Sequence, residues 1–166
     1  MNITSKSRYA LKIMMDLTEH ASADEAAVVQ RSDIAVRQGI PLDYMDHILS
    51  RLREAGLLGS VRGRSGGYRL LRSAETVSVW EIFLAVEDGF QPVQCLEGGV
   101  GCVSEHVCSS KDAWGLISSA IRSALSGIIL GDLVHRRELT KDFESLVSQT
   151  QECRAPKRRA GGSRLL

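Results

Sequence analysis

The chain has 166 residues, of which 43% are hydrophobic and 25% charged, and its formal net charge is +1. This is the composition of a soluble globular protein with one domain, or a compact module plus an arm, and it excludes disorder as the main state. No apolar stretch approaches the roughly 18 residues that span a bilayer, and no signal-peptide core is found, so we expect a cytoplasmic protein without a membrane partner.

The near-zero net charge hides two basic segments. Residues 51–72 hold six arginines against the single acid Glu54, and residues 153–166 hold five basic residues and no acid. The rest of the chain is therefore acidic. A localised basic stripe is the electrostatic footprint of phosphate binding, although the same pattern also describes a solvated basic face with a disordered tail.

Apolar spacing predicts three helices in the first third of the chain. The first covers residues 4–20, and the second runs from Val29 or Ser32 to Gln38. The third covers about residues 42–55 and is expected to bury its apolar side chains, namely Leu42, Met45, Ile48, Leu49 and Leu52. Between the second and third helices, Gly39-Ile40-Pro41 predicts a tight turn, because Gly adopts the left-handed conformation that ends a helix.

Two short helices joined by a Gly-containing turn are typical of a helix-turn-helix. The outer face of the second of these helices would carry polar side chains able to bond base edges, with a basic residue at its end for phosphate. These candidates are Asp43, Tyr44, Asp46, His47, Ser50 and Arg51.

A β-hairpin with a Gly-rich tip is predicted next, with strands at 57–62 and 68–71. A hairpin directly after a recognition helix is a wing, and Arg62 and Arg64 would reach phosphates or the minor groove. The glycines lie between two strands and do not open a helix, so they do not match a nucleotide-binding loop.

Two further helices are predicted beyond the wing. Ser78-Val79-Trp80-Glu81 has the capping-box pattern and opens a helix to about Asp88, with Leu84 among its core candidates. The segment Ser109-Ser110-Lys111-Asp112 is expected to cap a long amphipathic helix over about 110–129, which would serve as a dimer arm or pack on its own domain. One or two short helices follow from Asp132 to about Thr150.

Three of the four cysteines lie in one glycine-rich loop, at Cys95, Cys102 and Cys108. Structural zinc sites usually have closer cysteine pairs, whereas thiolates on a flexible loop suit an iron–sulfur cluster. His106 is a candidate fourth ligand, and Glu97, Glu105, a partner subunit or a small molecule are alternatives. Cys153 in the basic tail is interpreted as a spare thiol.

Four segments resemble the bacterial iron–sulfur-cluster regulator family, which comprises winged-helix repressors of the IscR, NsrR and RirA types. They are Ile3 to Ala10, Arg37 to Ile40, Ser50 to Arg53, and the wing Ser60 to Tyr68, and the resemblance extends to about residue 139. It implies a homodimer that senses iron, cluster supply, nitric oxide or redox state.

By the same resemblance, Cys95, Cys102 and Cys108 hold the cluster, Tyr44, Asp46 and His47 read bases, and Arg62 enters the minor groove. The chain departs from the family at the fourth ligand. Lys111 stands where the cluster-assembly type has His, and Arg8 stands where the nitric-oxide type can have Asp.

The sequence therefore predicts a mainly α protein, a winged helix-turn-helix with a small β-hairpin wing and a long C-terminal dimerisation helix. The expected divisions are a DNA-binding domain at 1–90, a cluster-binding loop at 91–109, dimerisation helices at 110–150 and a disordered basic tail at 151–166.

The predicted function is an iron–sulfur-sensing repressor of iron, cluster-assembly or stress genes, which binds a pseudo-palindromic DNA operator as a homodimer. A 2Fe-2S cluster is expected, with 4Fe-4S as the other option. A cluster-free thiol-redox regulator is the alternative. An enzyme with Cys108 or Cys102 as nucleophile and His106 as base is not expected, because no orienting group or oxyanion site is evident.

Overall fold

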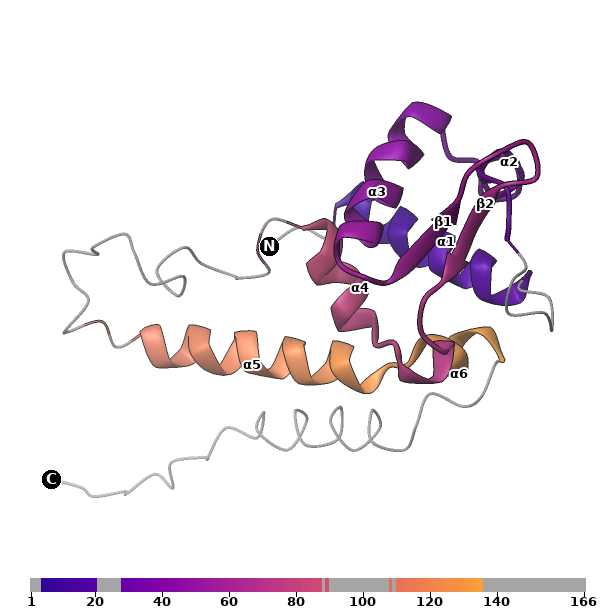
Figure 1. Cartoon of the computed structure of the whole chain (residues 1–166). Coiled ribbons are helices and arrows are strands. Elements are labelled where there is room, and N and C mark those ends of the chain that lie inside the picture. Colours follow the sequence, from indigo (N-terminus) through magenta and orange to yellow (C-terminus); the bar gives the residue numbers. More distant parts are fainter. Residues whose placement is uncertain (1–3, 21–27, 88, 90–107, 109, 136–166) are drawn as a thin grey trace, which may run out of the picture.

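The computed structural model describes residues 4–20, 28–87, 89, 108 and 110–135. Helices dominate it, and the only strands among these residues form one two-stranded antiparallel sheet. Figure 1 shows the first four helices and the hairpin gathered in one body, with a long helix along its lower edge. The elements are α1 (Ser5–Glu19), α2 (Arg31–Gln38), α3 (Leu42–Glu54), β1 (Leu58–Val61), β2 (Gly67–Leu70), a 3-10 turn (Ala74–Thr76), α4 (Val79–Val86), α5 (Lys111–Gly127) and α6 (Leu130–Val134).

The hydrophobic core lies where α1, α3 and α4 meet. The predicted apolar stripes account for most of it, since Ile13, Met14 and Leu17 of α1 are buried against residues of α3 and α4. Burial of side chains of this size stabilises a fold by about 1.5–3 kcal/mol each. The core therefore holds α3 with its opposite, polar face outward.

Two buried positions predicted from periodicity are wrong. Leu42, the first residue of α3, is 43% exposed, and Leu84 of α4 is 45% exposed. Leu42 precedes the first full turn that packs on the core, and Leu84 lies on the side of α4 away from the buried Ile82, Phe83 and Val86. An apolar residue at a helix start or on a flank satisfies the spacing rule without reaching the interior.

An ion pair between a buried carboxylate and a partly exposed arginine fixes α2 against α1. The carboxylate of Asp16 is fully buried, and it accepts hydrogen bonds from Arg37 Nε at 2.9 Å and Arg37 Nη2 at 2.6 Å. Gln38 Nε2 donates to the same carboxylate at 2.9 Å. Gly39 then adopts φ 64° and ends α2, so the predicted turn into α3 is confirmed.

The hairpin is tied to the chain that precedes α2. Val29 and Tyr68 exchange backbone hydrogen bonds of 2.9 and 2.8 Å, which adds an isolated bridge to strand β2. A Cβ at Gly67 would collide with the carbonyl oxygen of Val29, so only glycine permits this approach. The bridge was not predicted, and it sets where the hairpin stands relative to α2.

The predicted capping box at the start of α4 is confirmed. The Ser78 hydroxyl accepts from the backbone N–H of Glu81 at 3.2 Å, and the Glu81 carboxylate accepts from the backbone N–H of Ser78 at 2.9 Å. The hydrogen bond from the Ser78 backbone lowers the pKa of Glu81, and the hydrogen bond and charge of Arg72 lower this pKa as well. Glu81 therefore stays ionised where the helix dipole favours a negative charge.

The long C-terminal helix is shorter than predicted at both ends. Ser110 stands at the N-cap of α5, but its side chain does not cap the helix. At the other end, Ile128 is extended, and the backbone pairs Val79 N–H with Ile128 C=O and Leu130 N–H with Val77 C=O, each at 2.9 Å. This pairing with the strand-like entry to α4 ends α5 and allows the separate helix α6 to begin.

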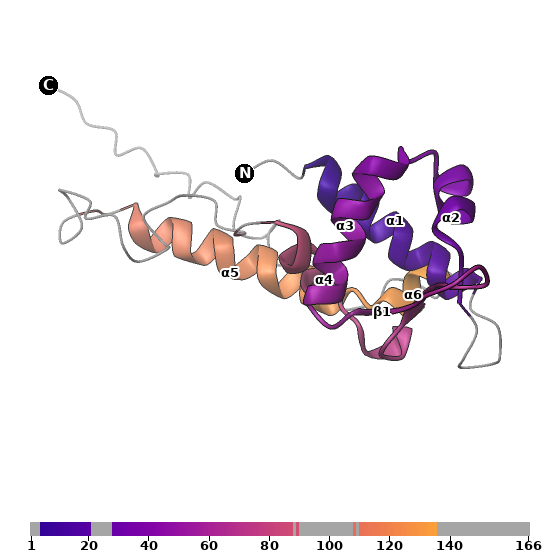
Figure 2. The ribbon, with the colours of Figure 1, turned by 45° about the horizontal axis from the view of Figure 1, so that its top comes forward.

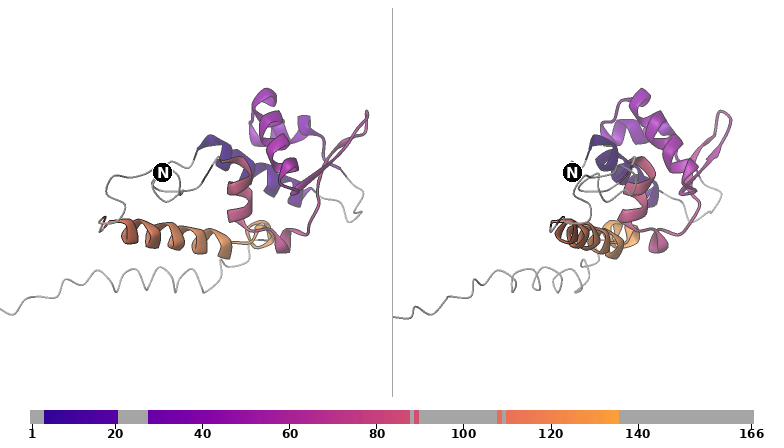
Figure 3. Two further views of the ribbon diagram at one scale, coloured as in Figure 1. Left: turned by 60° about the vertical axis from the view of Figure 1, so that its left-hand side comes forward. Right: turned by 90° about the vertical axis from the view of Figure 1, so that its left-hand side faces the viewer.

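Helix α5 extends beyond the compact body, as Figure 2 and the left view of Figure 3 show, and the right view of Figure 3 looks nearly along it. None of its residues is fully buried, although Ile121 and Leu125 pack partly against the core. Its exposed apolar side chains are Trp114, Leu116 and Ile117. Among the described residues, no helix is long and apolar enough to cross a membrane.

Asp16 gives a test of the ion pair between α1 and α2. Burial raises the pKa of Asp16, but the hydrogen bonds from Arg37 and Gln38 outweigh it, and the pKa lies below its ordinary value. We expect Asp16→Asn to lower the free energy of unfolding by about 2 kcal/mol at pH 7, measured by urea denaturation. Arg72→Gln breaks the half-exposed pair with Glu81 and should cost less than about 1 kcal/mol.

The difference in unfolding free energy between wild type and Asp16→Asn should depend on pH. Because the folded-state pKa of Asp16 is lowered, its ionised form stabilises the protein above about pH 4, and this stabilisation is lost as the pH falls further. The difference between wild type and Asp16→Asn should therefore shrink on acidification. A constant difference from neutral to acidic pH would contradict this account.

Candidate nucleic-acid interface

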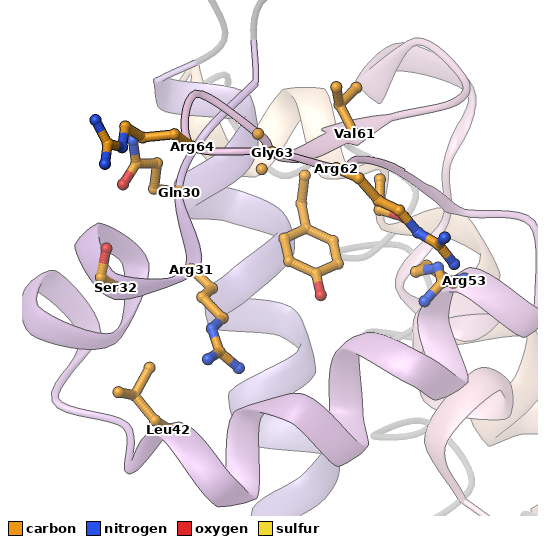
Figure 4. Close-up of a pocket in the computed structure, with 13 residues that line it drawn as sticks. Gln30, Arg31, Ser32, Leu42, Arg53, Val61, Arg62, Gly63 and Arg64 are labelled. Atoms are coloured by element: carbon orange, nitrogen blue, oxygen red, sulfur yellow. The ribbon is translucent and has the colours of Figure 1, made fainter.

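An open cavity of about 500 Å³ lies between the start of α2, helix α3 and the hairpin (Figure 4). We call it the arginine-lined cavity, because four arginines stand on its wall. They come from three separate elements of the chain, namely Arg31 from α2, Arg53 from α3, and Arg62 and Arg64 from the hairpin. Tyr68 of β2 also lines it. Charges that are distant in the sequence thus gather around one hollow.

The arginines from α3 and the hairpin are available to an anionic ligand. Arg53, Arg62 and Arg64 are exposed, and none forms an ion pair within the described ranges. Figure 4 shows Arg62 extending from the hairpin toward Arg53, whereas Arg64 points away on the other side. Guanidinium groups with this exposure bind phosphate oxygens well, and their combined field attracts a polyanion.

The geometry of the hairpin tip holds these arginines outward. Gly63 has φ 116°, and a Cβ at Gly66 would collide with the backbone oxygen of Val61. The turn is therefore compact, and Arg62 and Arg64 flank its left-handed glycine. Strand pairing of Leu58 with Leu70 through Val61 with Gly67 fixes the register below the tip. The predicted wing is confirmed, with β1 one residue shorter than expected at each end and β2 of the expected length but beginning and ending one residue earlier.

The predicted base-reading residues of α3 fall into two groups. Asp43, Asp46 and His47 are exposed on the face opposite the core. Tyr44 is half-buried, and its ring contacts the Tyr9 ring edge to face, with centroids 5.6 Å apart. The side chain of Tyr44 therefore packs α3 on α1 as well as bordering the outer face.

Arg51 has a different environment from the other predicted DNA-contacting arginines. It is half-buried, and it does not line the arginine-lined cavity. Arg53, two residues later and exposed, lines the cavity instead. The sequence-based prediction named Arg51 and did not name Arg53, because the basic charge of the 51–72 segment does not tell which arginine faces the hairpin.

The structure also adds a contact on this face that was not predicted. Arg31 Nη1 donates to Asp46 Oδ2, which joins the first turn of α2 to the outer face of α3. The two residues are fifteen positions apart, so no helical spacing rule could have found the pair.

Of the predicted cluster ligands, only Cys108 lies in the described part of the chain. Cys95, Cys102 and His106 lie outside it, and no group of three potential metal ligands occurs among the described residues. Cys108 Sγ lies 3.2 Å from Ser110 Oγ, just before α5. Hydrogen bonds from Ser110 and the nearby charge of Lys111 lower the pKa of Cys108, which favours the thiolate.

The hairpin beside an outward helix, with arginines around the hollow between them, defines a winged helix-turn-helix protein. The chain belongs to the Rrf2 family, described as iron-dependent transcriptional regulators, whose sequence profile matches residues 3–136. The HTH-type transcriptional regulator IscR of several Escherichia coli strains, O1:K1 among them, is 39% identical over 139 residues, which is 84% of this chain and 83% of the relative.

Solved structures of the same type superimpose on the chain. CymR, the global cysteine regulator of B. subtilis, matches with a TM-score of 0.67 and 25% identity, over 83% of this chain and 99% of that one. The T. potens IscR structure gives a TM-score of 0.63 at 25% identity, over 95% and 93%. The oxidized form of Staphylococcus aureus CymR gives 0.62 at 27% identity, over 81% and 96%. The chain is thus a helix-turn-helix transcriptional regulator of this family.

Arg62 gives a direct test of the interface. We expect Arg62→Ala to weaken binding to DNA and to reduce the slope of log K against log salt by about one, because one phosphate or minor-groove contact is lost. Fluorescence anisotropy with a labelled duplex at several salt concentrations measures both quantities. Arg72→Gln is the matched control, since Arg72 is already paired with Glu81 at 2.6 Å. Equal slopes for wild type and Arg62→Ala would refute the assignment.

Proposed function

We propose that this protein is a homodimeric repressor that binds a pseudo-palindromic DNA operator. The observation that carries the proposal is the arginine-lined cavity between the hairpin and the exposed face of α3. Phosphate contacts by Arg53 and Arg64 would fix the register on the duplex, and Arg62 would enter the minor groove. Asp43, Asp46 and His47 would meet base edges in the major groove, with Tyr44 at the border of that face.

The dimer would form through α5. Its apolar side chains remain uncovered in the single chain, and Leu116 is 73% exposed. Pairing two such helices would bury this face and join two copies of the DNA-binding module in one dimer. Recognition helices related by a two-fold axis bind half-sites that lie about one turn of the DNA duplex apart, or a multiple of it. A pseudo-palindromic operator is therefore expected.

We further propose that Cys95, Cys102 and Cys108 hold an iron–sulfur cluster, of the 2Fe-2S type or else 4Fe-4S, with His106 as a candidate fourth ligand. The family's description as iron-dependent regulators and the 39% identity to IscR support this. Cys108 suits the role, because its lowered pKa favours the thiolate that binds iron. When bound, the cluster would make the state of this loop sensitive to iron supply and to redox conditions.

A cluster bound in the loop would act on DNA binding through the residues at the two ends of the loop. Cys108 lies immediately before α5, and Lys111 N–H donates to its carbonyl oxygen at 3.2 Å. On the other side of the loop, Glu87 follows α4 and accepts hydrogen bonds from Thr4 and Ser7 of the α1 start, each at 2.5 Å. In this proposal the 91–109 segment joins the 1–90 DNA-binding domain to the dimer helix, and the protein acts in the cytoplasm.

A cluster-free thiol regulator is the second candidate. The structural likeness to CymR favours it, since one of those structures is an oxidized form. A lowered pKa of Cys108 would serve reversible oxidation equally well. The two candidates share the DNA-binding module and differ in what the loop cysteines hold.

Anaerobic purification with absorption spectra and iron and sulfide analysis separates these candidates. We expect wild type and Cys153→Ala to show the same visible absorption and iron content, and Cys102→Ala to lose both. Cys153 is the matched control, because it is the cysteine outside the 95–108 segment. A Cys102→Ala protein with unchanged iron and absorption would refute the cluster assignment. Colourless, iron-free wild type whose DNA affinity follows thiol oxidation would establish the thiol regulator instead.

A further inference from the structure

The contact between Arg31 and Asp46 lies on the surface that we propose to face DNA. Arg31 is the first residue of α2, and its guanidinium donates to Oδ2 of Asp46 on α3. The two side chains are about half exposed, at 51% and 46%, so solvent and a ligand can both reach the pair. Arg31 also lines the arginine-lined cavity, so the pair joins that cavity to the exposed face of α3.

Stability does not account well for this arrangement. A half-exposed ion pair typically contributes at most about 1 kcal/mol, and the buried pair between Asp16 and Arg37 already fixes α2 against α1. The contact restricts a long arginine side chain, and the lost conformational entropy offsets part of the stabilisation. A purely structural role would therefore add little to the free energy of unfolding. Its position on the ligand-facing surface, between two helices, favours a role in recognition.

The positive charge of Arg31 offsets negative charge on the outer face of α3. Asp43 and Asp46 both stand on the outer face of α3, and both raise the pKa of Arg31, chiefly through the hydrogen bond to Asp46. Two carboxylates facing a nucleic acid would be repelled by its phosphates. With Arg31 bound, the Asp46 charge is balanced locally, and the carboxylate can approach the duplex at lower electrostatic cost.

The geometry also leaves one carboxylate oxygen available. Arg31 occupies Oδ2, and no residue in the described part of the chain donates a hydrogen bond to Oδ1. An aspartate held at one oxygen loses rotamer freedom, so the other oxygen has a defined direction. In the major groove, a carboxylate oxygen accepts from the amino group of cytosine and finds an unfavourable acceptor at the same place on thymine.

We propose that Arg31 is a specificity-determining residue that holds Asp46 in place to accept a hydrogen bond from a cytosine in the operator. Arg31 acts through Asp46 as a positioning residue and does not itself contact the base. This inference rests on the proposed function as a DNA-binding regulator. It adds that base choice at one operator position depends on α2 as well as on α3.

The test is selection from a randomised duplex library with full-length protein, followed by competition binding on duplexes that differ at one base pair. Wild type should prefer C·G at one position per half-site. Arg31→Ala and Asp46→Ala should each reduce the preference for C over T at that position by about fivefold or more. The double variant should lose no more than either single variant, because the two residues act as one unit. Arg31→Lys should recover part of the preference.

Arg53→Ala is the matched control. Arg53 lines the same cavity but has no ion-pair partner among the described residues, so its loss should weaken binding to all duplexes alike and leave base preference unchanged. Far-UV circular dichroism verifies that each variant is folded.

The outcomes distinguish this inference from the function on which it rests. A wild-type protein that enriches no sequence would overturn both. A selective wild type with the same base preference in Arg31→Ala, or with a uniform loss across all duplexes, would overturn the role of Arg31 alone. The DNA-binding function would then stand.

Discussion

The buried carboxylate of Asp16 is the constraint on which the proposed DNA-binding surface depends. It is fully enclosed, and a charge in that position is stable only because Arg37 meets it with two hydrogen bonds and Gln38 with a third. Arg37 and Gln38 are the last residues of α2, directly before the left-handed Gly39. One interaction from α1 thus fixes both the end of α2 and the turn from which α3 departs.

Further contacts place the remaining elements relative to that helix pair. The bridge from Val29 to Tyr68 positions the hairpin from the start of α2, and it requires a glycine at position 67. The backbone pairing around Ile128 and Leu130 ties the end of α5 to the entry of α4. All of these contacts join segments distant in the chain. The arginine-lined cavity is therefore a product of tertiary contacts and not of any single motif.

Local patterns in the sequence were sufficient to predict the secondary structure but not its connections. The apolar stripe of α1, the turn at Gly39, the wing and the capping box at Ser78 all depend on residues within a few positions, and each is found in the structure. The contacts of Asp16 with Arg37 and of Arg31 with Asp46 were missed, because they join separate helices and leave no periodic signal. The end of α5 was misplaced for the same reason, since a distant backbone pairing overrides its helical pattern.

The same contacts limit how a ligand in the 91–109 segment could act on DNA binding. The two ends of the segment adjoin different elements, since Glu87 before it is bonded to the start of α1, and Cys108 near its end precedes α5. Helix α1 in turn packs on α3 through the ring contact of Tyr9 with Tyr44. Suppose that these parts have two arrangements and that a ligand binds one of them more tightly. The ligand can then change the affinity for DNA by no more than the ratio of its own affinities for the two arrangements. A ligand held equally well in both would leave DNA binding unchanged.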